Sequence, residues 1–237
     1  MNIVVLGSGG WGTAAAMLLS DNGHTVALWS HDPKKAELLD KTRENPLLKG
    51  VRIPERIAVT SDLAVLQNAE MAVFASPSFA LRSVAHEAAP HLKKGTLLVS
   101  LTKGIERGTH LRMSEIIAQE CGEGYRIAVL SGPSHAEEVG MGRLSYLTVV
   151  GTGPTLREQV AHMFERPYIR ISHSEDIFGV EYAAIMKNIY ALAVGMAVGL
   201  GYGDNFIAVL IANCAAEMER FLAAYAPQRR NICAAAH

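Results

Sequence analysis

Apolar runs of four to six residues alternate with amphipathic stretches over roughly the first 174 residues of the chain. Short apolar runs bounded by turn residues predict strands, and apolar positions three and four apart predict helices. The expected strands are Ile3–Leu6, Thr25–Trp29, Ile57–Thr60, Met71–Ala75, Thr96–Ser100, Arg126–Leu130, Ser145–Val150 and Ile169–Ser172, and the expected helices cover roughly 11–22, 33–43, 78–91, 109–121 and 154–165. Strands separated by helices favour an α/β fold with a Rossmann-like, doubly wound, mostly parallel sheet.

After residue 174 the pattern becomes helical only, with expected helices at 178–200 and 204–226. We therefore expect two domains, a dinucleotide-binding domain over 1–174 and an all-α domain over 175–237. If other parts of the chain leave apolar side chains of these two helices exposed, those side chains would associate with a second copy of the chain. We therefore expect a homodimer.

The apolar segment 178–200 is long enough to span a membrane, and Gly195 and Gly199 have the spacing of a membrane-helix pairing face. Glu181 and Lys187 lie inside the segment, and a central charge costs about 2.5 to 3.5 kcal/mol on insertion scales. We therefore expect no membrane span, but a buried helix whose small residues allow close packing.

Composition narrows the class of protein. The chain has 237 residues, 49% of them hydrophobic, and its 22 basic residues nearly balance 23 acidic ones, which argues against a nucleic-acid binder. Cys121, Cys214 and Cys233 are odd in number and too widely spaced for a zinc cluster, so we expect reduced thiols and no metal. The N-terminus lacks the pattern of a secretion signal, and we expect a cytoplasmic location.

A glycine-rich turn follows the first expected strand and precedes the first expected helix. In the pattern Gly-x-Gly-x-x-Gly, Gly7 would permit the tight turn, Gly9 would admit a pyrophosphate to the backbone, and Gly12 would let the helix pack closely. The positive helix N-terminus would then face the phosphates. We interpret the motif as a dinucleotide site.

Two lysines suit the chemistry of a nicotinamide enzyme, which needs a group that exchanges a proton with the substrate oxygen as hydride moves. Lys187 shares one helix face with Glu181, and burial beside a second cation would favour its neutral amine. Lys103 follows an expected strand on the side where the cofactor's reactive ring would lie, and is the candidate second cation. The alternatives are a solvated loop lysine at 103 and an ion pair of Lys187 with Glu181 or Glu217.

Several motifs together resemble one family. They are the glycine-rich turn with Trp11-Gly12, the loop Thr102-Lys103-Gly104, the turn Ser131-Gly132-Pro133-Ser134-His135-Ala136-Glu137-Glu138, the pair Lys187-Asn188, and the segment Gly201 to Asn205. In this order they resemble bacterial NAD(P)-dependent glycerol-3-phosphate dehydrogenases over essentially the whole chain. The resemblance implies interconversion of sn-glycerol 3-phosphate and dihydroxyacetone phosphate, with NAD or NADP as cofactor, for phospholipid synthesis.

The resemblance also implies roles for single residues. Positions that contact the cofactor are matched by Gly10, Trp11, His31 and Ala136. Positions that hold the phosphorylated substrate are matched by Lys103, Gly132, Ser134 and Lys187, with Lys187 in the place of the proton acceptor. Lys103, beside the expected place of the reactive ring, is predicted to touch cofactor and substrate alike.

The chain also departs from the family. His135 stands where an apolar aromatic is common, and we interpret it as a packing variant; Asn213 replaces a frequent arginine with no consequence that we can attach. Relatives continue through segments that supply a carboxylate and a phosphate clamp, so the all-α domain is expected to be truncated at His237. Arg229 and Arg230 are interpreted as a solvated cluster and not as that clamp.

The choice between the two cofactors depends on the end of the second strand. An NAD-specific site expects a carboxylate there, but the chain has Ser30 and His31, and Asp32 is placed to begin the next helix before Pro33. We therefore favour NADP or dual use. Two other functions stay open: another lysine-dependent Rossmann reductase, of the 3-hydroxyacid dehydrogenase or ketopantoate reductase type, and a non-enzymatic dinucleotide-binding module.

Overall fold

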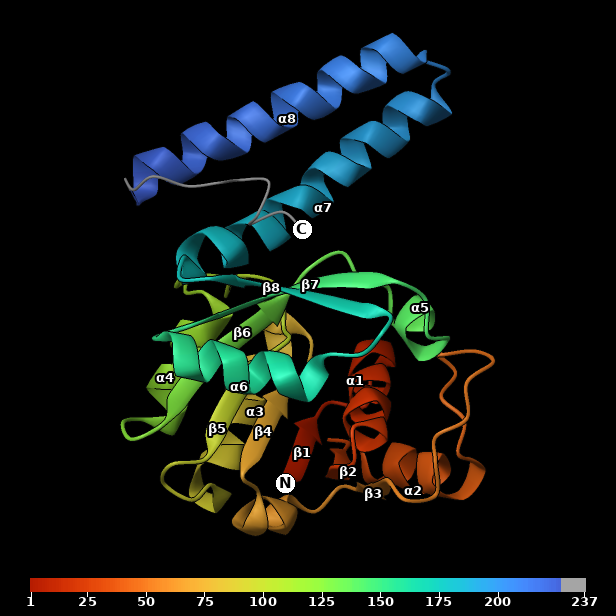
Figure 1. Cartoon of the computed structure of the whole chain (residues 1–237), viewed down its shortest axis with the longest axis vertical. Coiled ribbons are helices and arrows are strands. Elements are labelled where there is room, and N and C mark those ends of the chain that lie inside the picture. The colour runs from red at the N-terminus through yellow and green to blue at the C-terminus, as the bar shows by residue number, and fades with distance from the viewer. Residues whose placement is uncertain (227–237) are drawn as a thin grey trace.

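The computed structural model describes residues 1–226, and it contains one eight-stranded sheet with helices on both faces and a helical hairpin beyond it (Figure 1). The strands are β1 (Asn2–Leu6), β2 (Thr25–Trp29), β3 (Ala58–Thr60), β4 (Met71–Phe74), β5 (Leu97–Ser100), β6 (Arg126–Ser131), β7 (Ser145–Gly151) and β8 (Ile169–Ser174). The helices are α1 (Gly10–Asp21), α2 (Pro33–Thr42), α3 (Leu81–Ala88), α4 (Met113–Cys121), α5 (Ala136–Gly140), α6 (Pro154–Phe164), α7 (Ile177–Gly199) and α8 (Asp204–Tyr225).

The strand order is β3-β2-β1-β4-β5-β6-β7-β8, and every neighbouring pair is parallel except β6 with β7. The chain therefore has the predicted doubly wound, mostly parallel sheet. Buried strands of this kind need apolar side chains on both faces, and β4 and β5 are buried at every position. One core lies between the sheet and α1, α5 and α6, and the other lies between the sheet and α3 and α4.

The predicted elements are found, with differences at their ends. The helix expected over 78–91 is regular only at Leu81–Ala88, with short 3-10 turns at Ser78–Ala80 and Ala89–His91. The helix expected from 109 begins at Met113, because the preceding loop contains His110 with a positive φ of 60°. The short α5 was not predicted, since five residues are too few to display a helical period.

The inverted strand pair decides where α7 starts. β7 runs antiparallel to β6, and the edge strand β8 runs parallel to β7, so the chain leaves β8 at Ser174, which pairs with Val150, the partner of Val129. Val180 of α7 packs on Val129 and Val150. From this contact α7 continues away from the sheet (Figure 1).

The expectation of a buried helix over 178–200 is wrong for most of its length. α7 packs on the sheet only near its start and on α8 through residues such as Ala183 and Met186, and 28% of its most apolar window is buried. Gly195 and Gly199 have no neighbour within 4 Å of the position of an added Cβ, so they do not serve close packing. Within residues 1–226, α7 alone is long and apolar enough to pass as a membrane span on length and composition.

Cys121 and Cys214 are buried free thiols. Cys233 and the predicted basic cluster at Arg229 and Arg230 lie outside the described residues.

Candidate active site

The glycine-rich turn joins the end of β1 to the start of α1. Gly7 has φ of +130°, and a Cβ there would lie 2.6 Å from the Ala75 carbonyl oxygen; a Cβ on Gly12 would lie 1.9 Å from the Gly7 carbonyl oxygen. Both positions therefore need glycine for the fold itself. Gly9 is different, because a Cβ there would meet nothing within 4 Å. The space above Gly9 is open, as close approach of a ligand would require.

The first turn of α1 has no side-chain cap, since its N-cap residue is Gly9. Its first backbone N–H groups are therefore available to an anion, and the positive end of the helix dipole lies at the same point. This chain fits a dinucleotide phosphate here on two observations, the uncapped helix start and the open space above Gly9.

Helix α5 brings a second predicted residue to this turn. A Cβ added to Gly10 would lie 2.8 Å from the Leu47 carbonyl oxygen and 3.5 Å from the Cβ of Ala136, so Ala136 lies directly beside Gly10. Trp11 is half-buried and packs against the core under α1. The structure thus brings Gly10, Trp11 and Ala136 together from segments more than a hundred residues apart in the sequence.

Asn45 holds the turn in place and was missed by sequence reasoning. The side chain is 2% exposed and donates to the Thr13 hydroxyl at 2.7 Å and the Ser8 carbonyl at 3.2 Å, while its own oxygen accepts from the Leu47 backbone N–H at 3.0 Å. The Ser8 hydroxyl donates to the Ser30 hydroxyl at 2.9 Å. Asn45 therefore connects the turn to the loop after α2, and no short-range pattern could have indicated such a contact.

No carboxylate stands at the tip of β2, where Ser30 and His31 follow the strand. The Asp32 carboxylate accepts from the Lys34 backbone N–H at 2.9 Å and caps α2, with Pro33 in the first turn, as the sequence indicated. His31 is exposed, and its ring contacts the Trp29 ring edge to face at 6.1 Å between centroids. His31 lies at the same edge of the sheet as the glycine-rich turn, because both follow parallel strands that are neighbours in the sheet.

Lys103 lies in the loop after β5 and is not a solvated loop lysine. The Lys103 ammonium donates to the Gly132 carbonyl at 3.1 Å, and the Ser134 hydroxyl donates to the same carbonyl at 3.4 Å. Burial, chiefly, and the positive charge of Lys187 together lower the pKa of Lys103 from 10.5 to about 8. The loops after β5 and β6 therefore meet, as neighbouring parallel strands allow.

Lys187 is half-buried on α7. The repulsion between the two amines, which sequence reasoning assigned to Lys187, acts in the structure on Lys103. Among the described residues Lys187 has no carboxylate within 4 Å, and the alternative of a pair with Glu181 is wrong, because Glu181 binds Arg112 instead. Two neighbouring amines suit an anionic, oxygen-rich ligand.

A narrow cavity beside Lys103, with room for about one water molecule, lies between the sheet edge and α7. It is lined by residues 102–104 after β5, by Val129 and Ser131 of β6, and by Glu181 and Ala184 of α7. Sequence reasoning placed Glu181 on the same helix face as Lys187 but did not find its partners, which lie almost seventy residues earlier in the chain.

His135 is exposed at the N-cap of α5, so the interpretation of it as a packing variant is wrong; the ring contacts no core. Asn213 is exposed on α8. Over residues 1–226, no group of three or more His, Cys, Asp or Glu could hold a metal ion.

Comparison with known families places this geometry in context. Residues 2–156 match a family described as NAD-dependent glycerol-3-phosphate dehydrogenase N-terminus, and residues 176–236 match the family described as its C-terminus. The second match begins just after the end of β8.

Individual relatives agree. The chain is 44% identical over 221 residues to glycerol-3-phosphate dehydrogenase [NAD(P)+] of Moorella thermoacetica, covering 92% of this chain and 65% of that protein. It is 46% identical over 223 residues to the protein of the same name from Pseudomonas fluorescens, with 92% and 64% covered. The chain therefore spans slightly less than two thirds of these relatives.

A solved structure shares the whole architecture. The crystal structure of glycerol-3-phosphate dehydrogenase from Coxiella burnetii superposes with a TM-score of 0.91 at 29% identity, covering 99% of this chain and 73% of that one.

Proposed function

The chain belongs to the family of NAD-dependent glycerol-3-phosphate dehydrogenases, and from this premise we propose that it interconverts sn-glycerol 3-phosphate and dihydroxyacetone phosphate with NAD(P)H. The cofactor-binding domain is residues 1–174, and residues 175–237 form the first part of the substrate domain. The product would serve glycerophospholipid synthesis in the cytoplasm. Family membership does not favour the 3-hydroxyacid dehydrogenase or ketopantoate reductase alternatives.

In this proposal the glycine-rich turn binds the cofactor. Gly7, Gly9 and Gly12 shape the turn, and Gly10, Trp11 and Ala136 line it, while Lys103 lies toward the nicotinamide end and His31 toward the ribose of the adenosine half. The bound cofactor supplies or accepts the hydride. We favour NADP or dual use, because Asp32 caps α2 and because His31, Lys34 and Lys35 follow the strand that would meet a 2′-phosphate.

Lys187 is the proposed proton donor to the ketone oxygen and the proton acceptor in the reverse direction. Lys103, Gly132 and Ser134 hold the substrate beside it. The observation that carries the proposal is the pair of amines: the pKa of Lys103 is lowered to about 8 by burial and by the nearby charge of Lys187. A phosphorylated ketone bound beside the two amines would relieve this repulsion, so two neighbouring cations favour an anionic substrate.

The decisive experiment is oxidation of NADH and NADPH by the whole protein with dihydroxyacetone phosphate. We expect Lys187→Ala to lose at least a hundredfold in kcat, as general acid–base groups contribute 10²–10⁴, while the Kd for the cofactor is kept. Lys93→Ala, at an exposed lysine away from the pocket, is the matched control. Full turnover in Lys187→Ala contradicts the mechanism, and cofactor binding without turnover on any ketone supports the non-enzymatic module instead.

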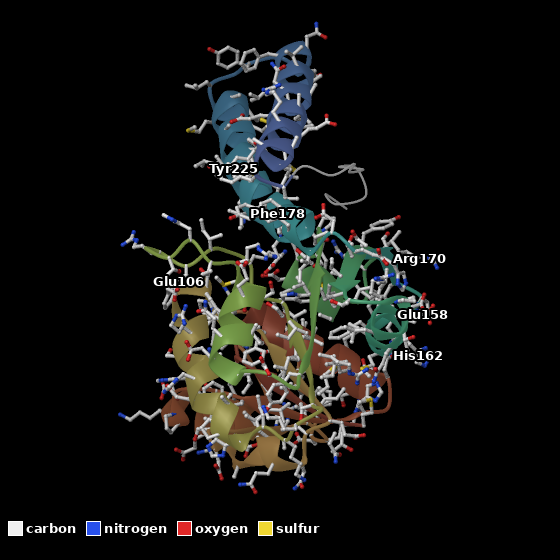
Figure 2. The ribbon with its side chains drawn as sticks, turned by 90° about the vertical axis from the view of Figure 1, so that its left-hand side faces the viewer. Glu106, Glu158, His162, Arg170, Phe178 and Tyr225 are labelled. Carbon is white, nitrogen blue, oxygen red and sulfur yellow. The ribbon has the colours of Figure 1, made fainter. Side chains whose placement is uncertain are left out.

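We further propose that the protein forms a homodimer through α7 and α8. Their exposed apolar side chains include Leu192, Met196, Phe206, Val209 and Ile211. Figure 2 shows the side chains of this hairpin projecting away from the domain, with Phe178 at its base. A monomeric mass by light scattering at high concentration would contradict the proposal.

A further inference from the structure

Glu181 is a carboxylate on α7 that is only 5% exposed. Burying a charge is costly unless it is paired and hydrogen-bonded. One Glu181 oxygen accepts from the Ser114 backbone N–H at 3.0 Å, and the other accepts from the Ser114 hydroxyl at 2.6 Å and from the Arg112 guanidinium at 3.0 Å. Three hydrogen bonds therefore join α7 to the start of α4.

Arg112 is itself held in place. Its guanidinium donates to the Glu115 carboxylate at 2.8 Å, its backbone N–H donates to the other Glu115 oxygen at 2.9 Å, and it lies 5.6 Å from the centre of the Phe178 ring. Phe178 lies where the helical hairpin meets the domain (Figure 2). We call Arg112, Ser114 and Glu181 the α4–α7 clamp.

The clamp lies next to the lysine pair. Glu181 lines the same pocket as Lys103, and Lys187 is six residues further along the same helix, about 9 Å along its axis at 1.5 Å per residue. Because α7 packs on the sheet only near its start and is mostly exposed further along, the clamp fixes the helix by polar contacts close to the site. The clamp on Glu181 therefore fixes the position of Lys187 along the axis of α7 and the direction in which it leaves the helix.

We propose that the α4–α7 clamp positions Lys187 against Lys103, so that Glu181 and Arg112 are positioning residues for the proposed dehydrogenase reaction. The clamp also engages both carboxylate oxygens of Glu181, and within residues 1–226 no ion pair joins Lys103 or Lys187 to a carboxylate. The inference rests on the proposed function only for the use of the two amines; their placement is tested separately.

A purely stabilising role predicts something different. Removing one partner of a buried ion pair destabilises a protein wherever the pair lies, so loss of stability alone would not distinguish positioning. Electrostatics does distinguish it. The charged group on α7 that lowers the pKa of Lys103 is Lys187, and Glu181 lines the same pocket as Lys103; at the start of α4, Arg112 contacts Glu181 and Glu115 contacts Arg112. Simple loss of the Glu181 charge would lower the pKa of Lys103, whereas release of α7 would hydrate Lys103, separate it from Lys187 and raise this pKa.

The experiment is competitive acetylation of lysines in the chain, followed by mass spectrometry, as a function of pH. The midpoint for Lys103 is independent of its accessibility and reports its pKa, which is about 8 in the intact protein. In Glu181→Ala we expect this midpoint to rise by at least one pH unit. Glu158→Gln removes an exposed carboxylate on α6, away from the clamp, and we expect its midpoint to stay near that of the parent.

Two further variants keep the test decisive. Ser114→Ala removes one hydroxyl and is expected to fold even if Glu181→Ala does not, with a smaller rise of the midpoint. In a Lys187→Met background, whose own midpoint is already raised, Glu181→Ala is expected to add less than it does alone, because residues that act through one another are not additive. A midpoint that stays or falls in folded Glu181→Ala or Ser114→Ala overturns the inference.

Activity gives the second measurement. In the whole protein, Glu181→Gln is expected to lower kcat at least tenfold with the cofactor KM unchanged, since the clamp does not touch the glycine-rich turn. If the protein has no turnover with dihydroxyacetone phosphate, the proposed function fails, while the acetylation midpoints still decide whether the clamp positions the lysines.

Discussion

Replacement of Lys103 by Met should stabilise the protein. The pKa of Lys103 is lowered from 10.5 to about 8, chiefly because burial disfavours the ammonium form. At 1.36 kcal/mol for each pKa unit, keeping this lysine protonated at pH 7 costs the folded state about 3 kcal/mol. Met has a similar volume and no charge. It loses the hydrogen bond to the Gly132 carbonyl, which contributes about 1 kcal/mol.

The net expectation for Lys103→Met is a gain of about 2 kcal/mol in the free energy of unfolding at pH 7, or a rise in Tm of about 4–8 °C for a chain of this size. The sign of the pH dependence follows from linkage. Between pH 8 and 10.5 the unfolded wild type binds more protons at this site than the folded one, so wild-type stability rises with pH in this window. The variant lacks that rise.

Urea denaturation at pH 7 and pH 9.5 measures both effects. The advantage of Lys103→Met should shrink from about 2 kcal/mol to nearly zero at pH 9.5, because about 2 kcal/mol of the protonation cost has then been relieved in the wild type. Lys93→Met, at an exposed lysine, is the control and should show no such trend. A variant less stable than wild type at pH 7, or an advantage that does not change with pH, would refute the reasoning.

Three other outcomes are expected. Gly9→Ala should keep the wild-type Tm but weaken NADPH binding, measured by calorimetry, at least tenfold, because only a ligand would meet the new methyl group. Gly12→Ala should fail to fold stably, since its Cβ would overlap a carbonyl oxygen. Equal effects of the two variants on Tm and binding would contradict the assignment of the open space above Gly9. Asn45→Ala should lower the free energy of unfolding, measured by urea denaturation, by about 2–4 kcal/mol, since buried donors and acceptors of the glycine-rich turn lose their partner. A loss under 1 kcal/mol would show that the turn is stable without the hydrogen bonds of Asn45. Leu192→Lys with Met196→Lys, one turn apart on exposed α7, should halve the mass seen by light scattering without changing the circular dichroism, and an unchanged oligomer would place the interface elsewhere.

The sheet could be predicted because its strands are continuous apolar runs, each closed by a turn residue and followed by an amphipathic helix. β2 was predicted to the residue, and the ends of the other strands differ by one or two positions. The side on which the site residues meet could also be predicted, because loops after parallel strands share one edge. Gly10 and Ala136 lie together for this reason.

Contacts across the chain could not be predicted. Asn45 and Arg112 look like ordinary loop residues in the sequence, and their roles depend on partners 32 and 69 residues away. The exposure of α7 was misjudged because an apolar composition shows that a helix needs cover but not whether the described residues provide it. The predicted ion pair of Lys187 with Glu181 is wrong for a related reason. Helical spacing puts the two side chains on one face of α7, but the guanidinium of Arg112, at the start of α4, binds the Glu181 carboxylate.

The antiparallel strand pair leads to a mechanical consequence. Because of this strand pair, α7 starts on the face of the sheet. A single unbroken helix therefore holds Glu181 in the clamp, Lys187 beside the site and Met196 near its outer end. At 1.5 Å per residue Lys187 is about 9 Å from Glu181 along the axis and Met196 about 22 Å. When α7 tilts about Glu181, Met196 therefore moves roughly two and a half times as far as Lys187. A fluorophore attached near Met196 would report sub-ångström movements of Lys187 without placing a probe in the site.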